Sequence, residues 1–156
     1  MSIITDAKGN VFESFHVVAE SALETMTLES PLTHALTVVR QGDKVLLLFN
    51  KWRRNWELPG GLIEQGETAR DCIMRELQEE TNQSAANVVF KGLMKFDLQP
   101  SFHGPQWTEY GALFAGELMD WREFEANDEA EQVMLWCRES DIGPIAEIER
   151  KLIEFA

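Results

Sequence analysis

Residues 61–83 read GLIEQGETARDCIMRELQEETNQ, and this stretch decides the fold expected for the chain. Thr68 can cap a helix with Asp71 three residues later, an arrangement that resembles a capping box. The apolar residues that follow recur at helical spacing, which marks one face for burial. They are Ala69, Cys72, Ile73 and Leu77. The periodicity fails at Asn82, a residue type that tolerates the left-handed conformation in which many helices end. The sequence therefore predicts an amphipathic helix that stops at residue 82.

Three glutamates belong to the same helix. Glu76, Glu79 and Glu80 stand at i,i+3 and i,i+4 spacing, so they should project from one side, opposite the apolar stripe. Taken alone, such a cluster is more often a solvated surface, because like charges at this spacing cost only about 0.2–0.5 kcal/mol per pair. Gly60 and Gly61 favour a second interpretation. Glycine lets the backbone expose carbonyl oxygens, and Mg²⁺ or Mn²⁺ accepts oxygen ligands.

Arg75 has two candidate partners. It lies two helical turns from Glu67 if the loop folds back at Gly66, and an ion pair between them would lock the loop onto the helix. Alternatively, Arg75 pairs only with Glu79 at i,i+4.

The segment resembles the Nudix box, which is written Gly, five residues, Glu, seven residues, Arg-Glu-apolar-any-Glu-Glu-any-Gly-apolar. Seven positions match at the required spacings: Gly61, Glu67, Arg75, Glu76, Leu77, Glu79 and Glu80. Residues 56–60, WELPG, also resemble the usual lead-in. So many fixed positions over so short a stretch are far more specific than a lone glycine-rich loop. Asn82 replaces the motif glycine and can supply its αL turn, whereas Gln83 replaces an apolar residue and is expected to loosen packing after the helix.

The resemblance to the Nudix (MutT-like) hydrolases implies a Mg²⁺-dependent enzyme, with Mn²⁺ as an alternative ion. By that resemblance the metal ligands are the Gly60 carbonyl with Glu76, Glu79 and Glu80, which are also the catalytic carboxylates. Gly61, Glu67 and Arg75 take structural roles in the motif. A general base would come from the box or from a later acidic loop, which resembles residues 125–131. There Glu129 is our choice and Glu131 the next, with a solvated charge run as the alternative.

The rest of the chain predicts strands around this helix. Apolar or alternating runs occur at residues 3–4, 11–18, 34–39, 45–49, 88–98, 107–117 and 133–137. The first two runs predict an N-terminal hairpin, and 34–39 with 45–49 predicts a core hairpin. Residues 51–57 read as a loop, Pro59-Gly60-Gly61 as a break in regular structure, and a C-terminal helix should start at Pro144. We expect an α/β/α sandwich with a mixed sheet, one Nudix domain over residues 1–156 in which residues 1–30 form a hairpin and connector extension.

Composition limits the partners. The formal net charge is −13, and the longest basic cluster is Lys51, Arg53 and Arg54, which argues against a nucleic-acid polymer and for one small nucleotide ligand. Cys72 and Cys137 lack partners at metal-ligand spacing, so we expect no zinc site. No apolar run could span a bilayer and the N-terminus does not resemble a signal peptide. We expect a cytoplasmic protein without membrane partners, and a homodimer is compatible with this composition.

The substrate is left open among nucleoside diphosphate derivatives. The small size favours a nucleoside triphosphate, whereas Pro100 lies near the position where ADP-ribose pyrophosphatases of the family carry a proline, so an ADP-ribose or nucleotide-sugar substrate stands level with it. The candidates for substrate binding are Trp52 and Phe102, which could stack on a base, and Arg53 and Arg54, which could hold phosphates or be ordinary surface charges. The alternative function is a catalytically silent Nudix domain that serves as a nucleotide sensor or interaction module.

Overall fold

The computed structural model describes residues 1–101 and 104–156. Within this part of the chain nine strands form one mixed sheet: β1 (Ile4–Thr5), β2 (Val11–His16), β3 (Leu32–Gln41), β4 (Lys44–Asn50), β5 (Asn55–Glu57), β6 (Gly60–Leu62), β7 (Ala85–Leu98), β8 (Trp107–Leu118) and β9 (Ala130–Trp136). Two α-helices and two 3-10 helices accompany it: α1 (Ala69–Thr81), α2 (Glu147–Leu152), η1 (Glu20–Glu24) and η2 (Ile153–Phe155).

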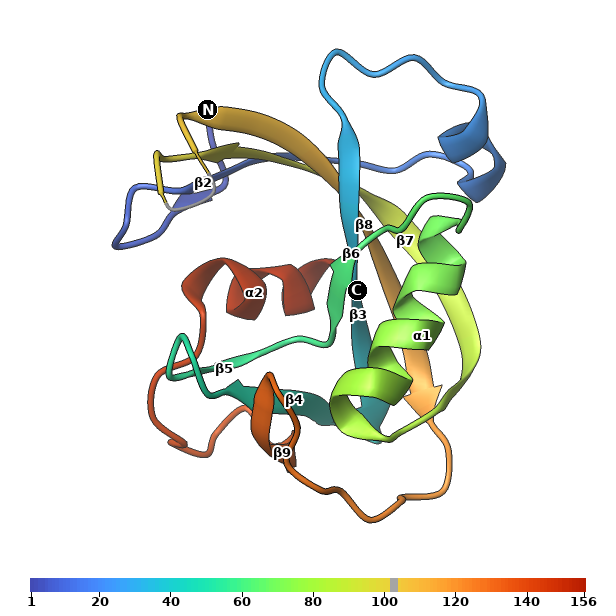
Figure 1. Ribbon diagram of the computed structural model, residues 1–156, viewed down its shortest axis with the longest axis vertical. Helices are drawn as coiled ribbons and strands as arrows, with labels where there is room; N and C mark the ends of the chain where they lie inside the picture. The colour runs from blue at the N-terminus through green and yellow to red at the C-terminus, as the bar shows by residue number, and fades with distance from the viewer. Residues whose placement is uncertain (102–103) are drawn as a thin grey trace.

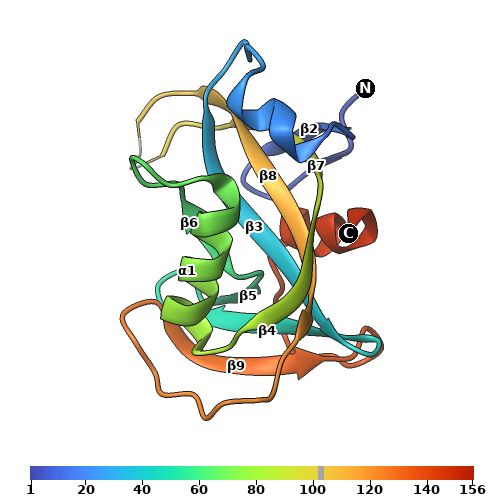
Figure 2. The same ribbon diagram turned by 90° about the vertical axis from the view of Figure 1, so that its right-hand side faces the viewer.

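The sheet order is β1-β2-β7-β8-β3-β4-β5, with β6 paired to β3 and β9 paired to β4. Strands β3 and β8 are parallel, and the other pairs are antiparallel. Helices α1 and α2 lie on opposite sides of β3 in both views of the ribbon (Figures 1 and 2). The α/β/α sandwich with a mixed sheet is therefore confirmed. No helix in the described residues is both long enough and apolar enough to pass through a bilayer.

Helix α1 forms as its sequence predicts. Thr68 and Asp71 exchange hydrogen bonds in a capping box, with both N-to-O distances at 3.1 Å. Asn82 ends the helix with a φ of 59°, in the left-handed region. The apolar stripe is buried against the sheet, where Cys72 and Ile73 pack with Ala35, Ala112 and Phe114. Burial also raises the pKa of the Cys72 thiol to about 12, as expected for a core residue rather than a reactive one.

The other face of the sheet carries the larger core cluster. Val38, Leu47, Leu113 and Trp136 pack there, and Leu152 of α2 covers them. The N-terminal hairpin predicted at residues 3–4 and 11–18 is present as β1 and β2, and β2 pairs along β7. Residues 11–16 are thus an integral part of the sheet.

The core hairpin is confirmed but short, and two expectations of irregular backbone were wrong because the residues pair as strands. The core hairpin pairs only at Arg40–Val45 and Gln41–Lys44, because β6 takes up the earlier part of β3. The expected loop at residues 51–57 ends in strand β5, which pairs with β4. The expected break at 59–61 includes strand β6, in which Gly60 and Gly61 pair with Leu36 and Ala35.

Two expectations at helix ends were also wrong. Helix α2 begins at Glu147 rather than Pro144. The reason is that the Pro144 carbonyl accepts a hydrogen bond from Trp56 N and the Ala146 N–H donates to Trp56 O, so this stretch is held as a bridge to β5. Gln83 does not loosen the chain after α1. It is fully buried, and its side-chain amide bonds both the N–H and the carbonyl of Arg122 at 2.9 and 2.7 Å.

Candidate active site

The loop before α1 is pressed onto the sheet and onto Glu80. Gly60 has a φ of 152°, and a Cβ at this position would lie 2.2 Å from the Ala35 carbonyl oxygen, so only glycine fits. The Gly60 N–H donates to Glu80 Oε1 at 2.8 Å. Strand β6 and the last turn of α1 are therefore joined at one carboxylate.

Glu80 is buried, with 6% of its surface exposed, and so does not project opposite the apolar stripe as the sequence suggested. The correction follows from its position at the edge of that stripe, where the Gly60 loop covers it. Burial, opposed by the Gly60 hydrogen bond and reinforced by the Glu129 and Glu76 carboxylates, raises the pKa of Glu80 to about 10. Burial likewise raises the pKa of Glu76 against the effect of Arg75.

Arg75 is the centre of an ion-pair network that includes both partners considered from the sequence. Its guanidinium meets Glu67 in two hydrogen bonds of 2.6 and 3.0 Å. Its Nη1 donates to Glu76 Oε1 at 2.8 Å and to Glu79 Oε2 at 3.1 Å. The Leu62 carbonyl also accepts from Arg75 at 3.1 Å. The loop that precedes the helix is thus locked onto it, as expected, and the pKa of Glu67 falls to about 2 because Arg75 and the Glu64 N–H hydrogen-bond its carboxylate.

The oxygen donors of the glutamates are of the kind that a hard divalent ion prefers. The donors are carboxylate oxygens together with the Gly60 carbonyl, and Glu80 forms no ion pair with any described residue. Among residues 1–101 and 104–156, no three acidic, histidine or cysteine side chains already converge as a metal-binding group. The physical reason is that Arg75 draws Glu76 and Glu79 to one side, while Glu80 turns toward Gly60. A dication would offset the mutual repulsion that the raised pKa values report.

Asn127 brings the acidic loop to this cluster. Its side-chain amide donates to the Glu80 carbonyl at 2.9 Å and to the Glu79 carbonyl at 3.3 Å, at the end of α1. Its Oδ1 accepts from the backbone N–H groups of Glu129 and Ala130 at 2.9 and 2.8 Å. One residue thus joins the helix end to the turn that carries Glu129.

Glu131 and Arg54 lie together at a different place. Arg54 pairs with Glu131 at 3.2 Å, and its guanidinium lies 4.8 Å from the centre of the Phe49 ring. Trp52 is largely exposed, and its indole N–H donates to the Asp128 carbonyl at 2.6 Å, beside the turn that carries Glu129. Phe102, the fourth substrate-binding candidate, lies outside the described residues.

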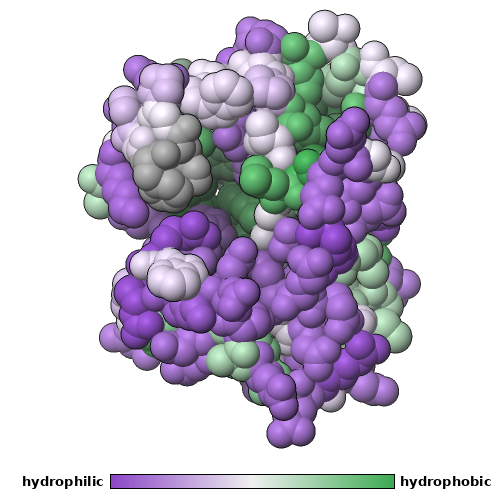
Figure 3. All heavy atoms as spheres, viewed as in Figure 1, coloured by the Kyte–Doolittle hydropathy of each residue, from purple (hydrophilic) through white to green (hydrophobic). Residues whose placement is uncertain are grey.

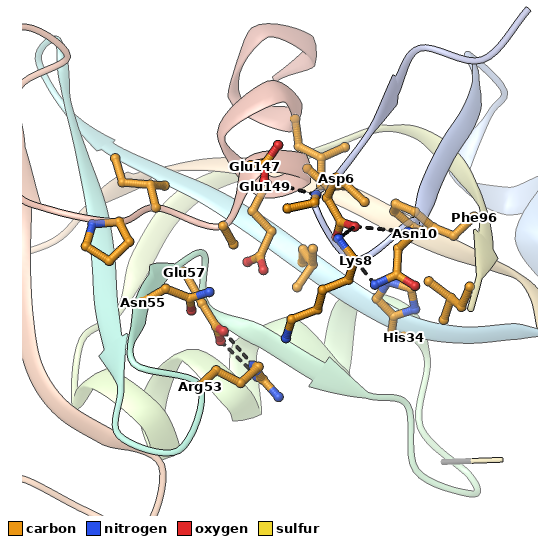
Figure 4. A pocket seen from close by; sticks show the side chains of 18 of the residues that line it. Asp6, Lys8, Asn10, His34, Arg53, Asn55, Glu57, Phe96, Glu147 and Glu149 are labelled. Atoms are coloured by element: carbon orange, nitrogen blue, oxygen red, sulfur yellow. Dashed lines mark hydrogen bonds and ion pairs between the residues drawn. The ribbon is translucent and has the colours of Figure 1, made fainter. Parts of the chain in front are cut away.

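A cavity of about 410 Å³ opens between the N-terminal hairpin, β3, β5 and α2. Apolar side chains at its wall include Leu36, Phe96, Leu98, Ile145 and Ile148, and polar ones include Lys8, Asn10, His34, Arg53, Glu57, Glu109 and Glu149. On the face drawn in Figure 3, apolar residues show in a recess, and hydrophilic residues cover most of the surface below it. Figure 4 shows the polar side chains entering the cavity from several separate elements.

Arg53 connects this cavity with the carboxylate cluster. It pairs with Glu57 through two hydrogen bonds of 2.6 and 2.8 Å, and Asn50 supports Glu57 at 3.3 Å. The pKa of Arg53 is raised by the Glu57 hydrogen bonds, against its burial, with further contributions from Glu149 and Glu129. Arg53 therefore lines the cavity and lies within the electrostatic range of Glu129.

The floor of the cavity carries a second polar group. Glu109 Oε2 lies 2.7 Å from both His34 Nδ1 and Thr33 Oγ1, and Trp107 Nε1 donates to its other oxygen at 2.8 Å. Burial raises the pKa of Glu109, but its hydrogen bonds, chiefly with His34, lower that pKa by more. The pKa of the carboxyl is therefore held below its usual range. The His34 ring lies 5.4 Å from Phe96.

Of the four substrate-binding candidates taken from the sequence, Arg53 lines the cavity, whereas Trp52 and Arg54 do not. The sequence reasoning missed Lys8, His34, Glu109, Glu149 and Asn127. None of them belongs to a recognisable spacing. The turn chemistry at residues 6–10 marked the segment of Lys8, and the acidic stretch 125–131 marked the segment of Asn127.

A mixed sheet between two helices, with a glutamate helix against a glycine loop, defines a Nudix-type domain. The family model of the NUDIX domain matches residues 31–155. The chain therefore belongs to this family, the family of the Nudix hydrolases.

Individual comparisons agree with this assignment. An uncharacterised Nudix hydrolase of Bacillus subtilis is 41% identical over 66 residues, which are 42% of either chain. A second Bacillus subtilis protein, provisionally named an 8-oxo-dGTP diphosphatase, is 32% identical over 82 residues, 53% of either chain. The chain thus spans about half the length of these curated relatives. The structure of a MutT Nudix hydrolase from Burkholderia pseudomallei is similar, with a TM-score of 0.66 at 17% sequence identity. The match covers 82% of this chain and 99% of that one, and it shows that the two chains share a fold.

Proposed function

We propose that the chain is a Mg²⁺-dependent hydrolase, with Mn²⁺ as an alternative ion, that cleaves a diphosphate linkage in a nucleoside diphosphate derivative. The observation that carries the proposal is Glu80, a buried carboxyl that accepts the Gly60 N–H, one helical turn from the half-buried Glu76. Arg53 lines a cavity of about 410 Å³ that would take a nucleoside.

The ligand set follows from the contacts of the loop and helix. Glu76, Glu79 and Glu80 would hold the ion together with the Gly60 carbonyl, with Glu79 released from Arg75 and Glu76 kept beside Gly61. A bound divalent ion lowers the pKa of a coordinated water and neutralises charge on phosphoryl oxygens. Gly61, Glu67 and Arg75 hold the loop and helix in register, because the Arg75 guanidinium also bonds the Leu62 carbonyl.

Glu129 is the residue we assign as the general base. Its backbone is fixed by Asn127, and its side chain lies within interaction range of Glu80, so it can accept the proton of a water that attacks phosphorus. Glu131 is the weaker candidate, because its carboxylate is already paired with Arg54.

The nucleoside and the diphosphate of the substrate would occupy two different parts of the site. The cavity has the volume of a small-molecule site and would take the nucleoside, while Arg53 would face the diphosphate. A nucleoside triphosphate and an ADP-ribose or nucleotide-sugar substrate both meet this description. The relative provisionally named an 8-oxo-dGTP diphosphatase makes triphosphates the first compounds to test. Trp52 and Arg54 stay as candidates for contacts outside the cavity, beside the Glu129 turn and Glu131.

The test is a Mg²⁺ titration with a panel of nucleoside triphosphates, ADP-ribose and nucleotide sugars, monitored by release of monophosphate, inorganic phosphate or pyrophosphate. Glu80→Gln removes one metal charge without changing volume and should lower kcat by about 100-fold or more, since an ion supplies several kcal/mol of transition-state stabilisation. Glu139→Gln, at an exposed turn after β9, is the matched control and should leave the rate unchanged.

A silent sensor or interaction module is the competing function. It predicts that nucleotides bind with no turnover of any panel member at saturating Mg²⁺ or Mn²⁺. Retention of a full set of metal donors argues for catalysis, because binding a nucleoside in the cavity needs no such set. We also propose that residues 1–156 form one domain, with residues 1–30 as an extension, since β2 pairs along β7 within the sheet.

A further inference from the structure

The turn of the N-terminal hairpin is a wall of the cavity. Asp6, Ala7, Lys8 and Asn10 line it, and these residues precede the segment 31–155 that the family model matches. A feature outside the matched segment thus shapes the part of the site that would hold the nucleoside.

The turn is rigidly built. Asp6 Oδ1 accepts from the backbone N–H groups of Lys8 and Asn10, both at 2.9 Å. Asn10 Oδ1 accepts from Gln99 N at 2.8 Å, just beyond the end of β7. On the other side, Ala7 N donates to Glu147 Oε1 of α2 at 3.1 Å. The backbone of Lys8 is therefore held between the end of β7 and helix α2.

The Lys8 side chain extends into the cavity, toward the region between Glu57 and His34 (Figure 4). In the described part of the chain Lys8 forms no ion pair within 4.0 Å, whereas Arg53, the other cation of the lining, is neutralised by two hydrogen bonds to Glu57. The Lys8 ammonium group is thus the available strong donor in the cavity.

Carboxylates outnumber cations around it. Besides Glu57, the lining contains Asp6, Glu109, Glu147 and Glu149. This excess negative charge would repel a further phosphate group in the cavity, whereas it would not repel a neutral base. A base that offers an acceptor to Lys8 and N–H donors to carboxylates matches the lining. Guanine presents two adjacent acceptors, O6 and N7, to an ammonium group and keeps its 2-amino donor for a carboxylate, whereas adenine places an amino donor beside N7, where it would face the ammonium group.

We propose that Lys8 contacts the nucleobase and selects a 6-oxopurine, guanine above all, over adenine. The inference rests on the proposed function for the location of the nucleoside, and it adds the base preference and the residue that sets it. The N-terminal hairpin then serves as a specificity element of the domain.

The test compares GTP with ATP for the wild type and for Lys8→Met. The wild type should have the higher kcat/KM with GTP. Lys8→Met should lower kcat/KM for GTP by about tenfold, mainly through KM, and leave ATP within about twofold. Lys8→Arg should retain most of the preference because it keeps a donor. Lys44→Met, at an exposed lysine that begins β4 outside the cavity, is the control and should behave as wild type.

Two results would overturn the proposal. An equal loss with GTP and ATP would show that Lys8 contacts phosphate or ribose, and an unchanged GTP rate would show that Lys8 contacts nothing in the complex. Calorimetry with GMP and AMP separates this idea from the hydrolase proposal. If no nucleotide is turned over but GMP binds more tightly than AMP and loses that advantage in Lys8→Met, the specificity element stands and the hydrolase proposal falls. If nucleotides are turned over but GTP is not preferred over ATP, the hydrolase proposal stands and the specificity element falls.

Discussion

Gly61→Ala tests whether the position of Glu76 matters to the reaction. A Cβ at Gly61 would lie 2.6 Å from Glu76 Oε1 and 2.7 Å from its Cδ. Gly61 does not have a positive φ, so the added methyl group strains no backbone. The substitution therefore acts on one carboxylate, which Arg75 holds from the other side at 2.8 Å.

The size of the effect follows from that contact. Ordinary van der Waals contact begins at 3.4 Å, so the Glu76 carboxylate must move by about 0.8 Å. A displacement near 1 Å of a group in a reaction site costs about 100-fold in rate. Stability should change much less, because the carboxylate is the end of a flexible side chain, and we expect a loss of about 1 kcal/mol. Gly61→Ala should thus lower kcat about 100-fold while the protein stays folded.

The assay is the Mg²⁺-dependent hydrolysis of the best panel substrate, with chemical denaturation as the measure of stability. Gly116→Ala is the matched control. Its Cβ would meet Val88, Ala85 and Ala86 at 3.1–3.4 Å, a mild overpacking on β8 away from the glutamates. A Gly61→Ala enzyme that keeps wild-type kcat and Mg²⁺ dependence would refute the idea that Glu76 takes part in metal binding.

Three further substitutions test how the site is supported. The pKa of Glu67 is about 2 against an ordinary value of 4.5, so this carboxylate contributes stability that is present above pH 4.5 and is lost as the pH falls toward 2. Glu67→Gln should therefore flatten this part of the pH profile of the unfolding free energy. An unaltered profile would contradict the role of the Arg75 pair. Asn127→Ala frees the turn that carries Glu129 and should lower kcat about tenfold with little change in KM, measured by steady-state kinetics; a change confined to KM would count against this positioning role. Gln83→Ala leaves both backbone groups of Arg122 without their partner and should lower the free energy of unfolding by about 1–3 kcal/mol, and an equally stable variant in denaturation curves would show that water replaces the amide.

The sequence predicts those features that depend on neighbours along the chain. The Thr68 cap, the buried face of α1 and the αL residue Asn82 all arise within residues 68–82 and are present as expected. The Arg75–Glu67 pair is also local, because it spans eight residues across one loop. Local rules work here because the capping hydrogen bonds and the helical period need no distant partner.

Several features that sequence reasoning missed depend on distant partners. Strand β6 exists because Gly60 and Gly61 pair with β3, and no local propensity favours a glycine strand. Gln83 is well packed because the Arg122 backbone meets its amide 39 residues later. The cavity takes Lys8, His34 and Glu149 from three separate segments, so no spacing in the sequence announces it.

Glu80 decides between the two interpretations of the glutamate helix. A solvated acidic face would leave all three carboxylates in water, and Glu79, with 60% of its side chain exposed, fits that description. Glu80 does not, because it is 6% exposed and the Gly60 N–H is its hydrogen-bond donor. Burial without a counter-charge raises the pKa of Glu80 to about 10, so a nearby cation would favour its ionised form. The buried carboxyl, with Glu76 one turn away on the same helix, therefore supports the proposed cation site between the helix and the Gly60 loop.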